Sequence, residues 1–481
     1  MVKDIKQFLS KTLTRYRNSL RIESGYEAEV HAVKSLASHN TPLATTLNQN
    51  VCEFKDPYLP NLETGSNSNI PESELSLLNQ EYHSSEFRSV PVLAPGMEIL
   101  IINKSINGDI YKSKPDKSII TGFKDVGEYE LDSTIGGYYI HKVNEEINGE
   151  VVLKKLFSKF YSREPRAITV DNHHIILLTN GYLYIYDKKI KKSYYLYNTL
   201  LATAHSIVRY PGKRSLFLIT GTGTDCLLKF NCQSHTLTPI WSAYDNGFNC
   251  NIDFMAGVKF FTYKHNGRFD KKIYDWAINQ GAPVRKLQQD SFLKTNSQTL
   301  FPEDQPTKFQ STHLSSAIIT RRKGCWYMLA TVFATTRITQ SKPSVGSELI
   351  AIRLNSNLEP EGSLPIRLDT DLINPHCIQQ IGQNHYIVCD TGNGKIKIYR
   401  DTGSSNIQLS IVGSIHFDSS WIHSANIEFL DNNLYLTAMD SANGKIIIIN
   451  LTEGIKKEIA IDKRAKVHYV KLLQHNEARP I

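Results

Sequence analysis

The chain has 481 residues, of which 41% are hydrophobic and 10% aromatic, and its formal net charge is +8 at pH 7. A single hydrophobic core usually stops growing at roughly 250–300 residues, so this length predicts several domains or one repeat architecture. No run approaches the roughly 20 apolar residues that span a bilayer, and residues 1–6 lack the basic-then-apolar order of a secretory signal. We therefore expect no transmembrane segment and a cytoplasmic location.

Charge and cysteine content exclude two further classes. The basic residues are scattered, and the densest clusters, residues 188–192 and 321–323, fall between apolar runs where turns are expected, so nucleic acid is not an expected partner. The cysteines are odd in number and lack CxxC spacing, which argues against a disulfide framework or a zinc ribbon. The seven are Cys52, Cys226, Cys232, Cys250, Cys325, Cys377 and Cys389.

The first 90 residues are predicted to form a helical and irregular N-terminal extension. Residues 1–22 place apolar side chains on one helical face and basic ones on the other, which suits packing on the rest of the protein or peripheral contact with an anionic membrane. A second helical stretch covers residues 26–38. The polar residues 40–85 indicate a linker or a wrapping arm.

From about Val90 to the C-terminus the pattern changes to short β-runs separated by Gly, Asn and Asp turns. One unit starts at Pro375-His376 and has its hairpin at Asp390-Thr391-Gly392-Asn393-Gly394. The next unit repeats this order, with its hairpin at residues 440–444. The Asn-Gly pairs predict tight turns in which both central residues have positive φ.

Histidine recurs near the start of these units, at His205, His313, His376 and His423, with His468 as a fifth member. The last three are spaced by 47 and 45 residues, the length of one four-stranded blade. Such repeats predict an all-β fold, a β-propeller of six or seven blades over residues 91–481. We prefer seven, with residues 138–156 as the extra blade. The first strands would line the central channel and bring the imidazoles to the axis.

The remaining segments fit this ring. The strand at residues 468–473 has no room after it for a full blade, so it is expected to pair with N-terminal strands such as 97–103 and close the ring. Residues 243–310 interrupt the period and are a candidate lid containing Tyr263, Tyr274 and Trp276, or one more irregular blade.

At the Asp-x-Gly-Asn-Gly-Lys-Ile turn of residues 390–396 the chain resembles NHL-type repeats, and residues 165–475 are similar to bacterial propellers of the virginiamycin-B-lyase and gluconolactonase kind. The histidines resemble those of two further families. One is the peptidyl-hydroxyglycine amidating lyases, which hold zinc, and the other is the carotenoid cleavage oxygenases, which hold ferrous iron with four histidines. This resemblance implies a propeller that can carry a metal on its axis. The sequence motifs of the oxygenases do not match, so carotenoid substrates are not implied.

Ligand chemistry narrows the choice of metal. Neutral imidazole suits iron, copper, zinc or nickel, whereas calcium prefers oxygen ligands. The leading hypothesis is a metal-dependent enzyme in which His205, His313, His376, His423 and His468 hold iron, copper or zinc and act on a small organic molecule, with oxidative chemistry favoured. A zinc-type lyase or hydrolase is the first alternative. A non-catalytic propeller that binds a protein or peptide, with structural histidines, is the second.

Arg166 occupies the corresponding position of another unit. It is a candidate catalytic residue that could hold a substrate carboxylate or phosphate, or it could form a salt bridge within the channel. Asp225, Asp390 and Asp440 lie in hairpin turns and are expected to cap backbone amides. Residues 221–224 resemble a phosphate loop only in composition, because no helix follows them. The other histidines are treated as surface or packing residues, and the oligomeric state cannot be predicted.

Overall fold

A computed structural model describes most of the repeat region and part of the N-terminal extension. The described residues are 70–90, 98–105, 136–143, 153–161, 165–170, 173–179, 182–190, 192–201, 203–243, 246, 248, 250–253, 258–261, 312–339, 342–362, 364–404, 406–461 and 466–473. The predicted helices of residues 1–38 lie outside these ranges, as do Tyr263, Tyr274 and Trp276 of the candidate lid.

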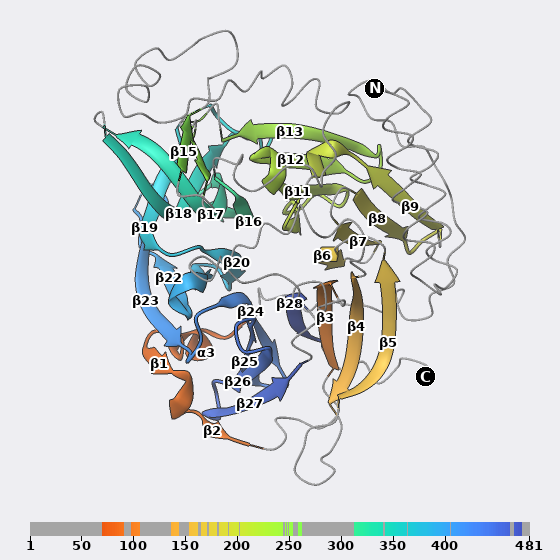
Figure 1. Cartoon of the computed structure of the whole chain (residues 1–481), viewed down its shortest axis with the longest axis vertical. Coiled ribbons are helices and arrows are strands. Elements are labelled where there is room, and N and C mark those ends of the chain that lie inside the picture. The colour runs from red at the N-terminus through yellow and green to blue at the C-terminus, as the bar shows by residue number, and fades with distance from the viewer. Residues whose placement is uncertain are drawn as a thin grey trace.

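The described strands form six sheets arranged around a central axis (Figure 1). Five of them contain four antiparallel strands that follow one another in sequence, and the sixth combines the C-terminal strand with three earlier ones. The inner strand of each sheet lies at the axis (Figure 1). Three of these sheets come from the first part of the repeat region and three from the second. The first three are built from β6 (Pro165–Val170), β7 (His174–Thr179), β8 (Tyr182–Asp187) and β9 (Lys192–Tyr197); from β10 (Ile207–Arg209), β11 (Leu216–Gly221), β12 (Cys226–Asn231) and β13 (Thr236–Ser242); and from β16 (Leu314–Arg322), β17 (Cys325–Thr339), β18 (Lys342–Leu354) and β19 (Ile366–Leu372).

The other three sheets follow the same plan, and the last of them joins the two ends of the chain. They are built from β20 (His376–Ile381), β21 (His385–Asp390), β22 (Lys395–Asp401) and β23 (Leu409–His416); from β24 (Ile422–Leu430), β25 (Asn433–Asp440), β26 (Lys445–Asn450) and β27 (Ile455–Ala460); and from β28 (Lys466–Leu473), β3 (Glu98–Ser105), β4 (Gly136–Val143) and β5 (Leu153–Tyr161).

The inner strands contact one another in a closed order: β6, β10, β16, β20, β24, β28 and back to β6. The fold is therefore an all-β propeller, as the repeats predicted. Its sheets bury apolar side chains against both neighbours, since β-branched and aromatic residues alternate along the strands.

Ring closure follows the prediction, whereas the strands that we assigned to a seventh blade belong to the closing sheet. Strand β28 pairs antiparallel with β3, with Val470 opposite Ile101. Residues 138–156, which we assigned to a seventh blade, contribute instead to β4 and β5, and these strands complete the sheet that β28 and β3 begin. The described residues thus form six sheets. Strands β3, β4 and β5 take their inner strand, β28, from the C-terminal part of the chain, so they form one blade together with it.

The hairpins differ in detail from the predicted tight turns. Residues Thr391–Asn393 form a short 3-10 turn, and of the Asn-Gly pair only Gly394 has a positive φ, of 61°. The Asn393 side chain donates instead to Asp390, and Asn443 donates in the same way to Asp440. The asparagines therefore stabilise the turn through their amide groups.

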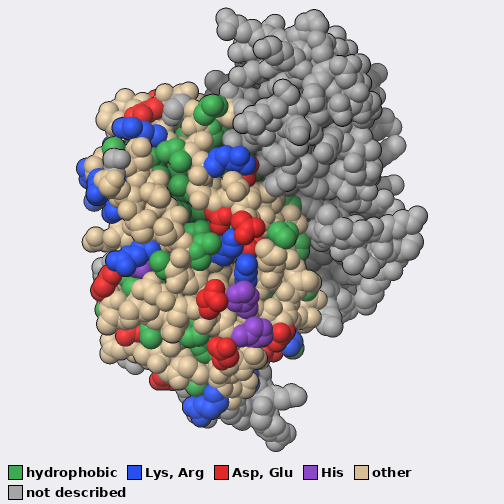
Figure 2. Space-filling view, turned by 90° about the vertical axis from the view of Figure 1, so that its left-hand side faces the viewer, with side chains coloured by type: hydrophobic (Ala, Val, Ile, Leu, Met, Phe, Trp, Pro, Cys, Tyr) green, Lys and Arg blue, Asp and Glu red, His purple; other side chains and the backbone are tan. Residues whose placement is uncertain are grey.

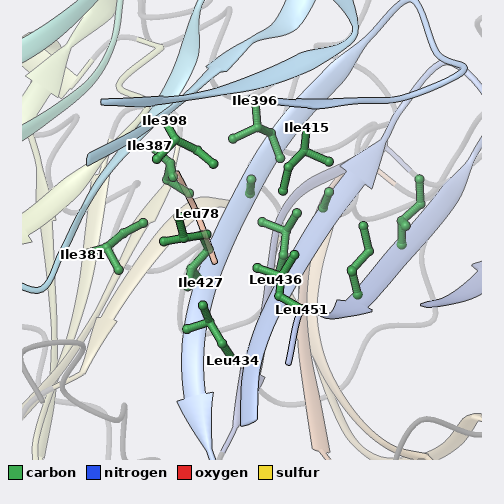
Figure 3. Packing of buried hydrophobic residues seen from close by; sticks show 14 of the residues in the cluster. Leu78, Ile381, Ile387, Ile396, Ile398, Ile415, Ile427, Leu434, Leu436 and Leu451 are labelled. Atoms are coloured by element: carbon green, nitrogen blue, oxygen red, sulfur yellow. The ribbon is translucent and has the colours of Figure 1, made fainter. Parts of the chain in front are cut away.

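The segment at residues 70–90 wraps around two sheets, which agrees with the arm alternative for the described part of residues 40–85. After the short helix α3 (Glu72–Ser76), strand β1 (Glu81–His83) pairs parallel with β23 and β2 (Arg88–Ser89) pairs parallel with β27. Leu78 is fully buried among Ile398, Ile415 and other apolar residues of the core between these sheets (Figure 3). The arm thus covers two outer strand edges that would otherwise be exposed.

Part of the 243–310 insertion is also described. Strands β14 (Cys250–Asp253) and β15 (Val258–Phe261) pair with each other, and β14 extends the sheet of β16–β19 by a contact with β17. These two strands do not start a blade of their own.

On the face formed by the outer strands at the left of Figure 1, acidic, basic and apolar side chains are interspersed (Figure 2).

Gly413 of β23 is the place where the arm crosses most closely. A Cβ at this position would lie 2.2 Å from the carbonyl oxygen of Leu78 and 2.5 Å from that of Gln80. We expect Gly413→Val to displace the arm and lower the free energy of unfolding by about 1–3 kcal/mol, the usual cost of overpacking. Limited proteolysis should then cut within residues 70–90 faster than in the wild type. Ser410→Ala, on the same strand, should leave the cleavage rate unchanged, and equal rates for both variants would contradict the packing.

Candidate functional site at the propeller axis

The predicted site residues all lie at the entry of an inner strand, but not at one equivalent position. His205 and His313 precede β10 and β16, whereas His376, His423 and His468 are the first, second and third residues of β20, β24 and β28. Backbone bulges compensate for this drift. The ladders skip Arg166, His423 and His468, each of which is the extra residue between two paired neighbours. A bulge re-aims a side chain and allows these residues to reach the axis.

The five imidazoles do come together. Ring centroids are 4.9 Å apart for His205 and His313, 5.2 Å for His205 and His468, 4.5 Å for His423 and His468, and 4.4 Å for His376 and His423. Phe333 fills the gap between His313 and His376, with its ring centroid 5.1 Å from that of His313 and 4.9 Å from that of His376. The six aromatic rings therefore form a closed circuit, which we call the axial cluster.

Backbone carbonyl groups fix the tautomer of three of these histidines. The Nδ1 atom of His376 is 3.1 Å from the Asn374 carbonyl oxygen, that of His468 is 2.9 Å from the Arg166 carbonyl oxygen, and that of His205 contacts the Thr203 carbonyl oxygen. A carbonyl oxygen can only accept, so each Nδ1 carries the proton. The lone pair of each neutral ring is then on Nε2, the atom on the opposite side from the backbone.

Hairpin threonines repeat this anchoring in two sheets. Thr222 Oγ1 is 2.8 Å from Nδ1 of His205, and Thr391 Oγ1 is 3.1 Å from Nδ1 of His376. The two residues whose carbonyl oxygens accept these hydrogen bonds, Thr203 and Asn374, have positive φ values of 45° and 51°. Because left-handed backbone is unfavourable for residues other than glycine, two occurrences at matching places indicate that the surrounding structure holds these rings firmly.

Arg166 enters the cluster and contacts His205. Its Nη1 atom donates to His205 Nε2 at 2.9 Å, and the residue is 5% exposed. The sequence left two roles for Arg166 open, which were binding a substrate anion and forming a salt bridge within the channel. The contact that the structure describes is with the imidazole of His205. Burial, followed by the charge of Arg166, holds the pKa of His205 well below its usual range. Burial and the neighbouring His423 do the same to the pKa of His376.

Two aromatic residues of the site were not predicted. Phe333 belongs to the long apolar run of β17, and Trp421 precedes β24 with its ring 5.8 Å from that of His376. Neither departs from ordinary strand composition, so only the register of the sheets could have placed them here. Together they wall the cluster on the side of β16 and β20.

The turn aspartates cap backbone amides, but only Asp440 does so within its own turn, as the expected Asx turn requires. Asp225 accepts hydrogen bonds from the backbone amides of Thr312 and His313 in the next sheet, at 3.1 and 3.0 Å. Asp390 accepts from the amide of Ile373, and Asp440 from that of Asn443. Asp225 therefore has a positioning effect on the site, because it fixes the backbone from which His313 projects.

The histidines that we treated as packing or surface residues have contacts away from the cluster where their side chains are described. His174 lies beside Asp187, His416 beside Ser414, and His385 is buried at 2% exposure. His235 takes a turn conformation with φ of 54°. Of the others, His141 lies in β4 and His173 directly precedes β7, whereas His265 is outside the described residues.

No group of three or more His, Cys, Asp or Glu side chains within the described ranges already has the arrangement of a metal site. The axial imidazoles are neighbours, but as they stand they do not form such a group. Metal coordination would require the rings to rotate about their side-chain torsions.

A second polar group lies on the same inner strands. Glu428 of β24 is 2% exposed, and neither carboxylate oxygen has a hydrogen-bond partner in the described part of the chain. Lys471 of β28 places its Nζ 3.7 Å from Oε1, close enough for an ion pair but too far for a hydrogen bond. Burial raises the pKa of Glu428 to about 7, from a usual value of 4.5.

This pair predicts a pH-dependent stability. Because the folded pKa of Glu428 is raised, folded protein keeps a proton that the unfolded chain has released, and this contribution destabilises the fold as pH rises from 4.5 to about 7. The double variant Glu428→Gln/Lys471→Met should therefore gain on the order of 2–3 kcal/mol at pH 8 relative to pH 4.5, compared with the wild type. Denaturant unfolding at both pH values measures this difference. Glu359→Gln, at an exposed ion pair, is the control and should keep the wild-type slope, and a double variant with that same slope would refute the assignment.

Comparisons with known proteins identify no family. No family model and no curated protein matches the chain. Among solved structures, it is similar to a chain of the nidogen/laminin complex, with 8% identity, 78% of this chain and 98% of that chain covered and a TM-score of 0.36. It is also similar to the periplasmic gluconolactonase of Pseudomonas aeruginosa, with 9% identity, 78% of this chain and 85% of that chain covered and a TM-score of 0.37. A protein of unknown function from Bacteroides caccae has 11% identity, with 79% of this chain and 100% of that chain covered and a TM-score of 0.38. At such TM-scores these likenesses carry no argument about what the protein does.

The class of protein is therefore defined by the fold itself: a β-propeller with five neighbouring imidazoles, three of them buried, and one buried guanidinium on its axis. No helix in the described ranges combines the length and the apolar character needed to cross a membrane.

Proposed function

We propose that this propeller is a metal-dependent enzyme that binds one divalent transition metal ion in the axial cluster and acts on a small anionic organic molecule. The observation that carries the proposal is the close spacing of neutral imidazoles on the axis, with ring centroids 4.4 Å apart for His376 and His423 and 4.5 Å for His423 and His468. Nδ1–H groups anchored on backbone carbonyls leave Nε2 lone pairs for a cation, and metal-binding histidines usually make this second hydrogen bond.

Three of the five predicted ligands fit best. A nitrogen at about 2.1 Å from a metal places the imidazole centroid about 3.2 Å from it, so two ligands that bind about 90° apart, as in octahedral coordination, have centroids about 4.5 Å apart. His376, His423 and His468 have spacings of 4.4 and 4.5 Å. His205 already accepts from Arg166, and Phe333 separates His313 from His376. We therefore assign His376, His423 and His468 as ligands, reached by rotation of the rings.

Arg166 would select the substrate. Its guanidinium lies beside His205, whose ring is 5.2 Å from that of His468, so a cation and an arginine would lie on neighbouring sides of one small space. A carboxylate or phosphate bound between them would relieve the repulsion between the two positive charges, and the planar fork of arginine matches such groups. The residues of this chain would thus bind and orient an anionic group, while Phe333 and Trp421 exclude water.

A bound metal with three neutral ligands would keep its charge and open positions, and could polarise a substrate oxygen or, if redox-active, use dioxygen. We favour iron or copper and oxidative chemistry, with zinc-dependent lysis or hydrolysis as the alternative for the same ligands. Metal analysis of untagged protein, followed by visible and paramagnetic resonance spectra, distinguishes them. About one equivalent of iron or copper supports the first, and zinc the second. No stoichiometric metal, with thermal stability unchanged by a chelator, would overturn both and favour a binding scaffold.

A further inference from the structure

Two thiols lie close together next to His376. Cys377 of β20 and Cys389 of β21 lie on paired strands, and both side chains pack in the same apolar cluster. The Sγ of Cys377 donates to the Ala425 carbonyl oxygen at 3.1 Å. Adjacent antiparallel strands bring Cα atoms to the range that a disulfide needs.

Cys377 occupies an unusual backbone position. The ladder between β20 and β21 is shifted between His376 and Ile378, so Cys377 is the bulged residue, and its φ is 32°. Positive φ is unfavourable for a residue with a Cβ and stores strain at this point. A bulge can also move without breaking the flanking pairs, which allows the Cys377 sulfur to approach Cys389.

The other cysteines with described side chains lack this arrangement. Cys226 contacts the Thr224 carbonyl oxygen, Cys232 lies against His174, and Cys325 is near Arg353 on another sheet. Cys377 is partly exposed, whereas Cys389 is fully buried. A small oxidant would therefore meet Cys377 first and Cys389 could then resolve it.

We propose that Cys377 and Cys389 form a redox-modification site, which a peroxide oxidises to a disulfide. The sulfur of Cys377 attacks the peroxide, its O–O bond breaks, and a sulfenic acid and one water form when the oxidant is hydrogen peroxide. The sulfur of Cys389 then displaces the hydroxyl group as a second water. In total the two thiols lose two protons and two electrons, and the peroxide takes up both.

The modification would act on the axial cluster. His376 immediately precedes Cys377, and its ring is 4.4 Å from that of His423. A covalent sulfur–sulfur bond of about 2.05 Å would pull the bulge toward β21 and change the direction of His376. This consequence rests on the proposed metal site, whereas the disulfide does not.

The test treats the full chain with hydrogen peroxide, alkylates the remaining thiols and maps the peptides by mass spectrometry. We expect a Cys377–Cys389 linked peptide that dithiothreitol removes. Cys377→Ser and Cys389→Ser, each checked for native circular dichroism, should lose it, and Cys325→Ser, a partly exposed thiol outside the pair, should keep it. Failure to link the pair while Cys325 is oxidised, or conversion of Cys377 to sulfinic acid in the wild type, would overturn the proposal.

A separate readout distinguishes the two claims. Titration of reduced and oxidised protein with zinc should show at least about tenfold weaker binding after oxidation, the size of effect produced by disturbing a ligand's orientation. Linked peptide with equal zinc affinity would leave the disulfide standing and remove its effect on His376. Absence of zinc binding in both forms would count against the proposed metal site alone.

Discussion

His423→Ala should reduce the affinity for the bound metal by at least about 100-fold and remove stoichiometric metal from the purified protein. His423 is the middle member of the assigned ligands, with ring spacings of 4.4 Å to His376 and 4.5 Å to His468. Its loss leaves two imidazoles, which cannot complete a site. The measurement is metal content by mass spectrometry together with titration by zinc.

The matched control is His416→Ala. His416 ends the outer strand β23, where its Nε2 atom is 2.9 Å from Ser414 Oγ, and it has no contact with the axial cluster. This variant should keep full metal content. Equal metal content in both variants would mean that the imidazoles fill the channel without binding a cation.

Val470→Asp should prevent cooperative folding of the ring. Val470 lies fully buried on the closing strand β28, in a cluster with Ile99 and Ile101 of β3 and with Met439 and Ile446 of the neighbouring sheet. An aspartate here would bury a carboxylate without a partner, at a cost of several kcal/mol, which is a large part of the 5–15 kcal/mol that usually stabilises a domain. Scanning calorimetry should show a strongly lowered or missing transition.

Ala460→Asp provides the comparison on an outer strand. Ala460 is exposed at the end of β27, so the same new charge remains in water and should change the transition little. A cooperative transition of Val470→Asp at the wild-type temperature would contradict closure of the ring by the pairing of β28 with β3.

The ring and its axis could be predicted because they depend on repetition. Histidines at intervals of one blade mark inner strands, and a terminal strand without partners indicates closure with the N-terminal part of the chain. The drift of the histidine from before β10 to the third residue of β28 could not be predicted, because it is compensated by bulges. A bulge depends on the pairing of two strands and leaves no local pattern in either one.

The assignment of residues 138–156 to a separate blade was wrong for a similar reason. Strands β4 and β5 follow β3 only after the long stretch 106–135, so the sequence pattern separates them from their own sheet. Phe333 and Trp421 were missed because aromatic residues are common in strands, and only three-dimensional neighbourhood distinguishes those that face the axis. The hydrogen bond between Arg166 and His205 could not be predicted either, because the two residues belong to different sheets.

The most direct test of the proposed metal site is an anomalous-scattering experiment on crystals of untagged protein, measured above and below the absorption edge of the metal found. The account predicts one strong peak on the axis, within about 2.1 Å of Nε2 atoms of His376, His423 and His468. A crystal from metal-supplemented protein that shows no peak there would contradict it.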